Sequence, residues 1–569
     1  MLNRQGHGLR LFAVAAITIA LLLPFVNKAF HVDDTLFLYS ARQILKNPLR
    51  PYDFMVHWNP TEEHMWEVTM NPPLASYYSA AITGLFGERE VALHLAYMLP
   101  ALGAGLATYW LALSIGASPF WSAIILVASP GFLVTATGVS SDMITLSFYV
   151  IAVAAFVRGS QKGSWGLLVF SSLAAGLCSV SKYIGITVVP LLVAYSVIRE
   201  RRISPRLLVF LITLAIFSAW AVHGMLYYGR PHFFEAAMYK SKIFEAGRRF
   251  SLLSVSRRLY LIIASASFFA GSLGPSACLS AWFCRHKLRV FLISALAACV
   301  AASIMVPIRA YFGNTVSCAA LPMLLAFVCV TSVFLCWCFG GMKSWSPERW
   351  LLALWVFGIL LFAAYFNWTV AVRVVLFCLP AAAILLGLAV KSGNMRHCWV
   401  KVLVGATVVL ALVVTAADYH WSGSYRRIAH ELMSARRNGL ADTGERYKSN
   451  FAGKLYFQAH WGLQFYLERA GWEYFVWSPR HNEYDRLESI DRLVLTPLSM
   501  PNKPLFDAVD EQIRKGALKV VNVEDISPFL CVHTQNKRTR AGFYSAGSGP
   551  VPYLFSRQPC ETFILLEQP

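Results

Sequence analysis

An apolar run near residue 9 is followed at once by two acidic residues. Residues 9–29 read Leu9-Arg-Leu-Phe-Ala-Val-Ala-Ala-Ile-Thr-Ile-Ala-Leu-Leu-Leu-Pro-Phe-Val-Asn-Lys-Ala29, and the polar stretch after them reads His31-Val-Asp-Asp-Thr-Leu-Phe-Leu-Tyr-Ser-Ala-Arg42. The apolar run is long enough to cross a bilayer, which takes about 17–25 residues of helix. Carboxylates at the mouth of such a span are costly and usually functional. The stretch therefore predicts a membrane protein whose chemistry takes place at one membrane face.

Similar apolar runs recur along most of the chain. Of its 569 residues 57% are hydrophobic and 14% are charged, with a mean hydropathy of +0.52, whereas a soluble domain carries about 25% charged residues. We place about thirteen spans: 9–29, 91–114, 119–137, 142–158, 164–181, 183–198, 206–228, 258–283, 289–307, 315–340, 350–367, 374–391 and 401–417. The first could be a signal peptide, but Asn27-Lys28-Ala29 is a poor cleavage site, and we expect an uncleaved helix.

The charged residues between the runs indicate how the helices are oriented. The net charge of +20 does not gather on a soluble face, as nucleic-acid binding would require. With a cytoplasmic N-terminus, the basic residues fall in the inside loops: Arg158, Lys162, Arg199, Arg201, Arg202, Arg206, Arg285, Lys287, Arg289, Lys343, Arg349, Lys391, Arg396 and Lys401. The loop at 31–90 is rich in Asp and Glu instead. This positive-inside pattern supports both the span count and the direction, and the excess basic residues can meet anionic membrane lipids.

Three segments then lie outside the cytoplasm. They are the first loop at 31–90, a second loop at 229–257, and residues 418–569, while residues 1–417 form the transmembrane domain. Four strand-like runs occur in the last segment at 454–458, 474–477, 493–496 and 518–522, with helical patterns at 461–470 and 504–515. This alternation predicts a small soluble α/β domain. In an oxidising compartment its two cysteines, Cys531 and Cys560, could form a disulfide, and two free thiols are the alternative.

Six ionisable residues fall at the outer ends of helices in this topology. They are Asp33, Asp34, Asp142, Lys182, Arg309 and Arg373. A single cation there could be an anchor that snorkels to the interface. As a set, cations on the acidic outer side run against the positive-inside bias and need another partner. An anionic lipid phosphate would supply that partner, and the carboxylates would serve for acid/base work.

Other patterns carry less information. The chain has no Gly-x-x-x-x-Gly-Lys-Ser/Thr loop, so no nucleotide cofactor is expected by that route. His57 and His64 with Glu62 and Glu63 could bind a cation in the first loop, or could be solvated loop residues. No paired C-x-x-C spacing indicates zinc. A metal role thus stays undefined, apart from a possible divalent cation near the carboxylates.

Several motifs in order resemble those of a known family. Asp33-Asp34 followed by Ala41-Arg42 resembles the Asp-Glu and Ala-Arg pattern in the first external loop of membrane glycosyltransferases of the protein O-mannosyltransferase and aminoarabinose transferase type. The further matches are Asn71-Pro-Pro-Leu74, Ser141-Asp142-Met-Ile-Thr-Leu146, Gly176-Leu-Cys-Ser-Val-Ser-Lys182-Tyr183, Arg373 with Leu379-Pro380, and Trp461-Gly-Leu-Gln-Phe-Tyr466. Asp34 stands for the family's usual Glu, Asn71 for its Lys, and Tyr183 for its Gly.

The resemblance implies a C-type glycosyltransferase fold and an activity. Such enzymes move a sugar from a polyprenyl-phosphate donor to a lipid glycan or a protein outside the cytoplasm. It implies Asp33 as the catalytic base with Asp34 as a second carboxylate. Lys182, Arg373 and Arg309 then bind the donor phosphate, and Asp142, Asn71 and Arg42 contact substrate. We expect the protein in the inner (cytoplasmic) membrane, with the C-terminal domain periplasmic or extracellular.

Two other functions remain open from the sequence. A transporter or flippase of lipid-linked glycans would share the many spans and basic pockets, but it should carry broken or repeated helices with mid-span charges. A non-catalytic membrane scaffold would explain the spans but not the carboxylates and cations together. The charges at span ends and the long acidic first loop favour the glycosyltransferase.

Overall fold

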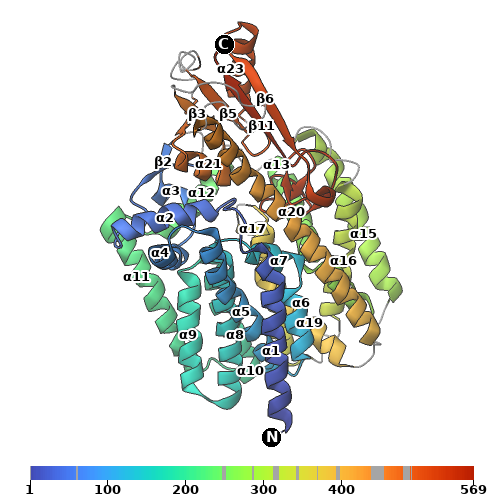
Figure 1. The fold of residues 1–569 in the computed structure, drawn as a ribbon. Coiled ribbons are helices and arrows are strands. Elements are labelled where there is room, and N and C mark those ends of the chain that lie inside the picture. The colour runs from blue at the N-terminus through green and yellow to red at the C-terminus, as the bar shows by residue number, and fades with distance from the viewer. Residues whose placement is uncertain are drawn as a thin grey trace.

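The protein is a bundle of helices with a small sheet-containing domain at one end (Figure 1). The computed structural model describes residues 2–58, 62–245, 252–282, 284, 287–311, 320–340, 345–367, 369–392, 397–437, 454–477, 487, 490–500 and 502–569. The N-terminus lies at the opposite end of the bundle from the sheet-containing domain (Figure 1).

Ten described helices are long and apolar enough to cross a membrane. They are Gly6–Phe25, Glu90–Ile115, Ser141–Lys162, Tyr183–Glu200, Pro205–Tyr228, Arg257–Trp282, Ala320–Cys338, Pro347–Tyr365, Val372–Lys391 and His397–Ser434. A bent pair of helices, Pro119–Val127 and Pro130–Ala136, gives an eleventh span if the pair is counted as one. Two shorter apolar helices occur at Trp165–Ser179 and Leu292–Ser303. These segments coincide with the thirteen predicted spans, so the predicted polytopic helical fold is confirmed.

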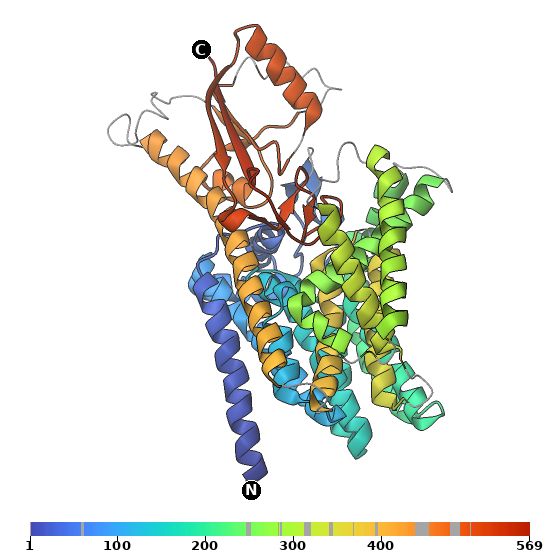
Figure 2. The same ribbon diagram turned by 90° about the vertical axis from the view of Figure 1, so that its right-hand side faces the viewer.

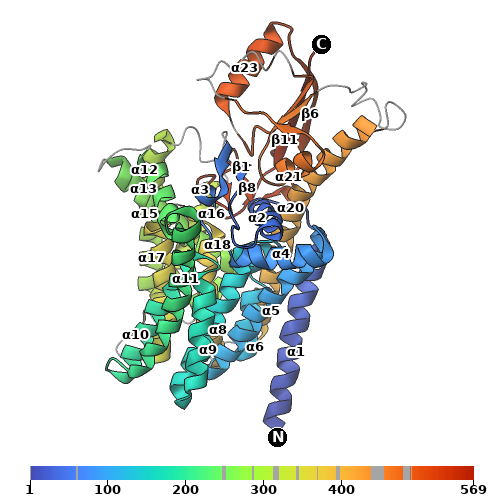
Figure 3. The ribbon, with the colours of Figure 1, turned by 90° about the vertical axis from the view of Figure 1, so that its left-hand side faces the viewer.

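The main helices of the bundle, all except α14, are labelled in Figures 1 and 3. They are α1 (Leu2–Leu22), α5 (Glu90–Ile115), α6 (Pro119–Val127), α7 (Pro130–Ala136), α8 (Ser141–Lys162), α9 (Trp165–Ser179), α10 (Val188–Glu200), α11 (Phe210–Tyr228), α13 (Leu252–Leu273), α14 (Leu279–Trp282), α15 (Lys287–Tyr311), α16 (Ala320–Cys338), α17 (Pro347–Tyr365), α18 (Val372–Val375), α19 (Leu379–Lys391) and α20 (His397–Arg437).

The break between α6 and α7 positions a loop that the site uses. The two helices are bent by 61°. Pro130 is the first residue of α7, and the Ser129 hydroxyl accepts the Phe132 N–H at 3.4 Å. Proline fits a first helical turn but interrupts a helix interior, because it lacks the N–H. Pro130 therefore separates α7 from α6, and the loop after α7 reaches Asp34, whose carboxylate accepts the Val139 N–H at 2.8 Å.

The first external loop is largely structured. Helices α2 (Asp34–Lys46) and α4 (Leu74–Phe86) lie across the end of the bundle (Figure 3) and pack through Ala41, Ile44 and Ala80. Strands β1 (Met55–His57) and β2 (Glu62–His64) and helix α3 (Met65–Val68) connect them. Helix α12 (His232–Glu245) of the second loop is at the same end (Figure 3).

The C-terminal domain is an α/β unit, as predicted. Its sheet has the order β4-β3-β5-β11-β6, with β3 parallel to β4 and β5, and β11 antiparallel to β5 and β6. The elements are β3 (Leu455–Gln458), α21 (Trp461–Arg469), β4 (Glu473–Tyr474), β5 (Arg492–Leu495), α23 (Lys503–Arg514), β6 (Lys519–Ile526) and β11 (Glu561–Glu567). Side chains alternate across a strand. Leu493 and Leu495 accordingly join the core with α23, and Val494 joins the core with α21.

Between β6 and β11 the chain turns back toward the bundle. Short strands β7 (Val532–His533) and β10 (Leu554–Phe555) pair with each other, as do β8 (Gln535–Asn536) and β9 (Ala541–Gly542). Figure 2 shows this segment at the junction of the domain and the helices. A turn precedes it at Phe529–Cys531.

A single helix joins the membrane bundle to the C-terminal domain. Helix α20 has 41 residues, about 60 Å at 1.5 Å per residue, or twice the thickness of the hydrocarbon core. It runs through residue 417, where the sequence suggested a domain boundary, and on into the domain (Figure 2). The last span and the start of the C-terminal domain therefore share one continuous element.

Candidate active site

Asp33 lies in the loop between α1 and α2, at the end of the bundle that contacts the C-terminal domain. Val32 has φ of 49°, a left-handed conformation that is unfavourable for a β-branched residue and marks a constrained turn. Asp33 is the first residue before α2, yet its side chain makes no capping hydrogen bond. Its carboxylate instead forms an ion pair with the guanidinium of Arg373, 340 residues further along the chain. Helix capping therefore does not account for Asp33.

A second ion pair lies beside the first. The Lys182 ammonium binds the Asp142 carboxylate at 2.5 Å, and the Ser140 hydroxyl donates to the same carboxylate at 3.0 Å. The pKa of Lys182 is lowered from its ordinary value. Burial is the largest cause and the nearby charge of Arg373 acts in the same direction, while the charge of Asp142 opposes the shift. Asp33, Asp142, Lys182 and Arg373 are called the charged network below.

Three of the four side chains in the charged network are partly exposed, so a ligand can contact them. The side chains of Asp33, Arg373 and Lys182 are 22%, 18% and 17% exposed, and that of Asp142 is 3% exposed. Two carboxylates and two cations balance, so the charged network is close to neutral. A phosphate that enters can take over the cations and leave a carboxylate free, which is the property a base needs.

Asp34 has a different environment from Asp33. It is 4% exposed, and its two oxygens accept the N–H groups of His31 at 3.0 Å and Val139 at 2.8 Å. Burial raises the pKa of Asp34 to about 7, against the opposing charge of Lys28 and the two backbone hydrogen bonds. In this structure Asp34 joins the start of α2 to the loop after α7, and so fixes the backbone that carries Asp33.

A buried ion pair that the sequence analysis did not identify lies next to the site. The Lys28 ammonium binds the Asp418 carboxylate of α20 at 2.6 Å, and the side chains are 1% and 0% exposed. Thr534 and Tyr544 each donate a hydroxyl hydrogen bond to Asp418 at 2.7 Å. Buried charges are stable only when paired and hydrogen-bonded, as these are. The first span, the last span and the C-terminal domain thus meet at one carboxylate.

The C-terminal domain also contacts the segment that carries Arg373. The Val372 N–H donates to the Phe543 carbonyl at 2.9 Å, and the Ala546 N–H donates to the Val370 carbonyl at 2.7 Å. Tyr544, between these two positions, lines a small pocket together with Asp33 and Arg373. The domain is therefore a wall of the site and not a separate appendage.

The structure brings five of the predicted site residues together, namely Asp33, Asp34, Asp142, Lys182 and Arg373, and leaves others apart. Arg42 pairs with Glu88 at 2.5 and 2.7 Å and lies over the Phe465 ring. The Asn71 carbonyl accepts the Tyr52 hydroxyl at 2.8 Å in the loop before α4. Neither is among the described residues that line the pocket at Asp33. The side chain of Arg309 lies outside the described part of the chain.

Cys531 and Cys560 are free in the structure. Cys560 is the residue just before β11, and its thiol contacts the Ile526 carbonyl at 3.2 Å. Cys531 lies in the turn after β6, with φ of 60°. The structure therefore shows two free thiols in place of the disulfide that the sequence suggested.

Within the described ranges, no group of three or more His, Cys, Asp or Glu side chains could hold a metal ion. His57 stacks on Tyr474 with ring centroids 4.6 Å apart, and His64 lies 3.4 Å from Asp53. The two histidines of the first loop are therefore engaged separately.

Several solved membrane proteins are similar to this chain. ArnT from Cupriavidus metallidurans bound to undecaprenyl phosphate is 16% identical, with a TM-score of 0.44 over 91% of this chain and 96% of that one. The Archaeoglobus fulgidus oligosaccharyltransferase in its apo form is 12% identical, with a TM-score of 0.46 over 86% and 69%. The S. cerevisiae protein O-mannosyltransferase Pmt1-Pmt2 complex bound to the sugar donor is 16% identical, with a TM-score of 0.31 over 40% and 34%. No curated protein sequence matches.

The sequence itself matches one family over part of its length. Residues 70–223 match the family described as dolichyl-phosphate-mannose-protein mannosyltransferase. The matched segment begins at the Asn71-Pro-Pro-Leu74 motif and includes Asp142 and Lys182. The match confirms the predicted resemblance to the membrane glycosyltransferases, and glycosyltransferase is the class of enzyme that it supports.

Proposed function

We propose that the chain transfers a sugar from a polyprenyl-phosphate donor to a hydroxyl group of a lipid-glycan or protein acceptor. The observation that carries this proposal is the charged network, in which two cations and two carboxylates from four separate segments converge at one end of the bundle. The reaction takes place at the membrane face that bears the C-terminal domain.

The two cations suit a lipid-linked phosphate. Arg373 offers a planar fork that binds two phosphate oxygens, and Lys182 adds a point charge beside it. The leaving polyprenyl phosphate is a stable anion, so cations that hold it are sufficient and no protonation of the leaving group is needed. As the phosphate binds Arg373, the Asp33 carboxylate loses its partner.

Asp33 is then the general base. The acceptor oxygen attacks the anomeric carbon, the bond from that carbon to the phosphate oxygen breaks, and its electron pair leaves with the polyprenyl phosphate. The proton of the acceptor hydroxyl passes to the Asp33 carboxylate. Asp142, nearly buried beside Lys182, positions that lysine, and Asp34 holds the loop.

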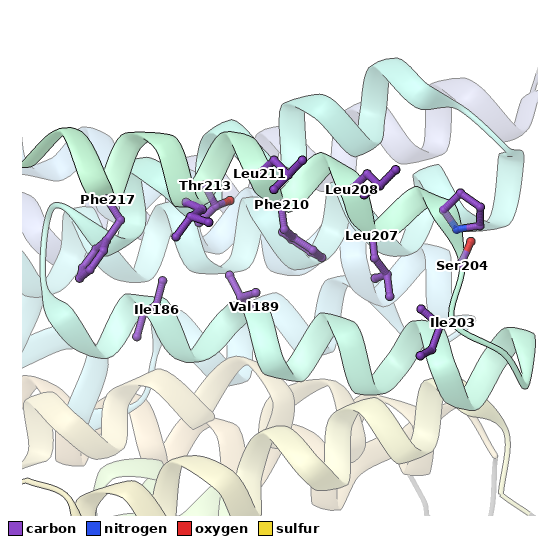
Figure 4. Close-up of a pocket in the computed structure, with 12 residues that line it drawn as sticks. Ile186, Val189, Ile203, Ser204, Leu207, Leu208, Phe210, Leu211, Thr213 and Phe217 are labelled. Atoms are coloured by element: carbon purple, nitrogen blue, oxygen red, sulfur yellow. The ribbon is translucent and has the colours of Figure 1, made fainter.

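An apolar groove beneath Lys182 fits a lipid donor. It lies between α10 and α11, has a volume of about 670 Å³, and extends from Ile186 and Phe217 to Ile203 (Figure 4). Ile186 follows Lys182 by four residues. A donor with its phosphate at Lys182 can therefore lay an isoprenoid chain along this groove.

The distribution of charge favours an outside location for the site. The end of α10 that carries Arg199 and is followed by Arg201 lies away from the C-terminal domain (Figure 3), and Arg199 pairs there with Glu348 in the first turn of α17, next to Arg349. Cytoplasmic loops carry such an excess of Lys and Arg. We place the N-terminus in the cytoplasm and the C-terminal domain outside the inner membrane.

The test compares membrane lipids and glycans from cells that carry the wild type or Asp33→Asn. Asp53→Asn is the matched control, because Asp53 is in the same loop but pairs with Arg50 at the surface. Mass spectrometry should show one glycan lacking its sugar with Asp33→Asn and not with Asp53→Asn. Normal transfer by Asp33→Asn would remove Asp33 from the role of base. Donor movement across the membrane without any sugar-linked product would identify a flippase instead.

A further inference from the structure

A second polar cavity lies above the charged network. It has a volume of about 360 Å³ and lies where α20 and α21 meet the segment between β6 and β11. Its lining includes Trp421, Trp461, Lys537, Ser545 and Glu561. We call it the Trp461 cavity, and the proposed transfer reaction gives it no role so far.

Aromatic rings form one side of the Trp461 cavity. The rings of Trp421 and Trp461 are 5.9 Å apart and perpendicular. Trp461 has φ of 58°, and the next residue, Gly462, fits against the Phe30 carbonyl where an added Cβ would lie only 2.2 Å from the oxygen. Bulky residues rarely adopt this backbone conformation, and where they do it is often at a binding site. The chain thus holds a large flat ring at the cavity wall at some conformational cost.

Two groups in the wall, the Trp421 indole N–H and the Lys537 ammonium, have hydrogen-bonding capacity that the described chain does not use. The Trp421 side chain is 4% exposed, and its indole N–H has no partner among the described residues. Lys537 is the one Lys or Arg in the described lining, and it pairs with no carboxylate of the described chain. Loss of water around its ammonium group lowers its pKa. Glu561, by contrast, accepts the Tyr425 hydroxyl at 3.0 Å and is fully buried.

The Trp461 cavity adjoins the reacting centre. The His31 ring, next to the Asp33 loop, is 4.3 Å from Trp421 and 6.3 Å from Trp461. Ser545 lines the cavity, and Tyr544, its neighbour in the chain, lines the pocket at Asp33. A molecule in the cavity is therefore placed on the side of Asp33 that faces away from the membrane, where an acceptor hydroxyl is needed.

We propose that the Trp461 cavity binds a sugar residue of the acceptor that carries an anionic group. The sugar ring lies against Trp461, and the anionic group, a carboxylate or a phosphate, pairs with Lys537. A flat aromatic face suits the apolar face of a sugar ring, while the unpaired ammonium needs an anion. This inference rests on the proposed transfer reaction and defines its acceptor as an acidic glycan.

Binding can be measured without catalysis. Full-length protein in detergent is examined by saturation-transfer NMR with glucuronic acid, glucose 6-phosphate and neutral glucose as probes. Wild type should bind both acidic sugars about two- to five-fold more tightly than glucose, the range expected of one partly exposed ion pair. Lys537→Met should remove that preference, and Lys537→Arg should keep it. Trp461→Ala and the milder Trp461→Phe should weaken the binding of all three sugars, and the alanine variant should lose more affinity than the phenylalanine variant.

Two controls separate this inference from the catalytic one. Lys515→Met removes a lysine of the same domain that is bound to Glu511 at the surface, and it should bind like wild type. Asp33→Asn should also bind like wild type, even though it should not transfer sugar. Equal binding of acidic and neutral sugars by wild type, or an unchanged preference in Lys537→Met, would overturn the proposal. Transfer lost in Asp33→Asn with no sugar bound by wild type would leave the reaction in place and refute the cavity.

Discussion

Arg373 gives the sharpest test of the donor-phosphate site. Its guanidinium is bound by Asp33 in the empty site, and its side chain is 18% exposed. Arg373→Ala removes the whole fork. Arg373→Lys keeps one positive charge and loses the second, parallel hydrogen bond. The two substitutions therefore separate charge from geometry.

The magnitudes follow from the number of hydrogen bonds lost. A hydrogen bond to a charged group contributes about 1.5–3 kcal/mol. Loss of two bonds in Arg373→Ala should raise the Kd for polyprenyl phosphate by about 10²–10⁴-fold, and loss of one in Arg373→Lys by about 10–10²-fold. We expect values at the low end, because the phosphate must displace Asp33 from the guanidinium.

The assay is native mass spectrometry of the purified full chain with added polyprenyl phosphate. Arg199→Ala is the matched control, since Arg199 pairs with Glu348 at 2.8 Å at the far end of α10 from Lys182. It should bind the lipid like wild type. Equal losses in Arg373→Ala and Arg373→Lys would show that the fork has no role. A loss in Arg199→Ala of the same size would show that the effect is general destabilisation.

Three further outcomes follow from buried groups. Burial raises the pKa of Asp34 to about 7 from an ordinary value of 3.8. The protonated carboxyl therefore contributes stability to the fold below about pH 3.8, and this contribution is lost as pH rises to about 7. The thermal midpoint of wild type should fall over this range, and that of Asp34→Asn should change less. Lys28→Met or Asp418→Asn alone should cost about 3–5 kcal/mol by leaving a buried charge unpaired, seen as a lower thermal midpoint, and the double substitution should cost less than the sum. Maleimide should label Cys531 in folded protein without reductant, whereas Cys560, 5% exposed, should need unfolding; a single disulfide in the intact mass would contradict this.

The membrane architecture was predictable because its signals are local. Each span is a continuous apolar run, and successive spans return the chain to the same end of the bundle. That topology alone was enough to place Asp33, Asp142, Lys182 and Arg373 on one side. It could not show which carboxylate pairs with which cation, since those pairs join segments 40 and 340 residues apart and depend on helix packing.

Residues that complete the site from the C-terminal domain gave no comparable signal. Tyr544 lies in an irregular segment with neither helical nor strand periodicity. In the sequence Lys28 entered only as part of the poor cleavage site Asn27-Lys28-Ala29, although it is buried against Asp418. Arg42 shows the opposite case, since a family motif suggested a substrate contact and the structure pairs it with Glu88.

The pairing of Lys28 with Asp418 has a consequence for how the protein is made. The two residues are 390 positions apart, and at about 5–20 residues per second a ribosome needs about 20–80 s to synthesise the chain between them. Through that interval Lys28 has already been inserted but its carboxylate does not yet exist. The ammonium must meanwhile be held by water, lipid phosphate or an insertion factor, and the nascent enzyme has no finished catalytic centre. Only after residues 534–546 have been synthesised and have packed against Asp418 of α20 can this end of the bundle close, so incomplete chains should remain inactive during biogenesis.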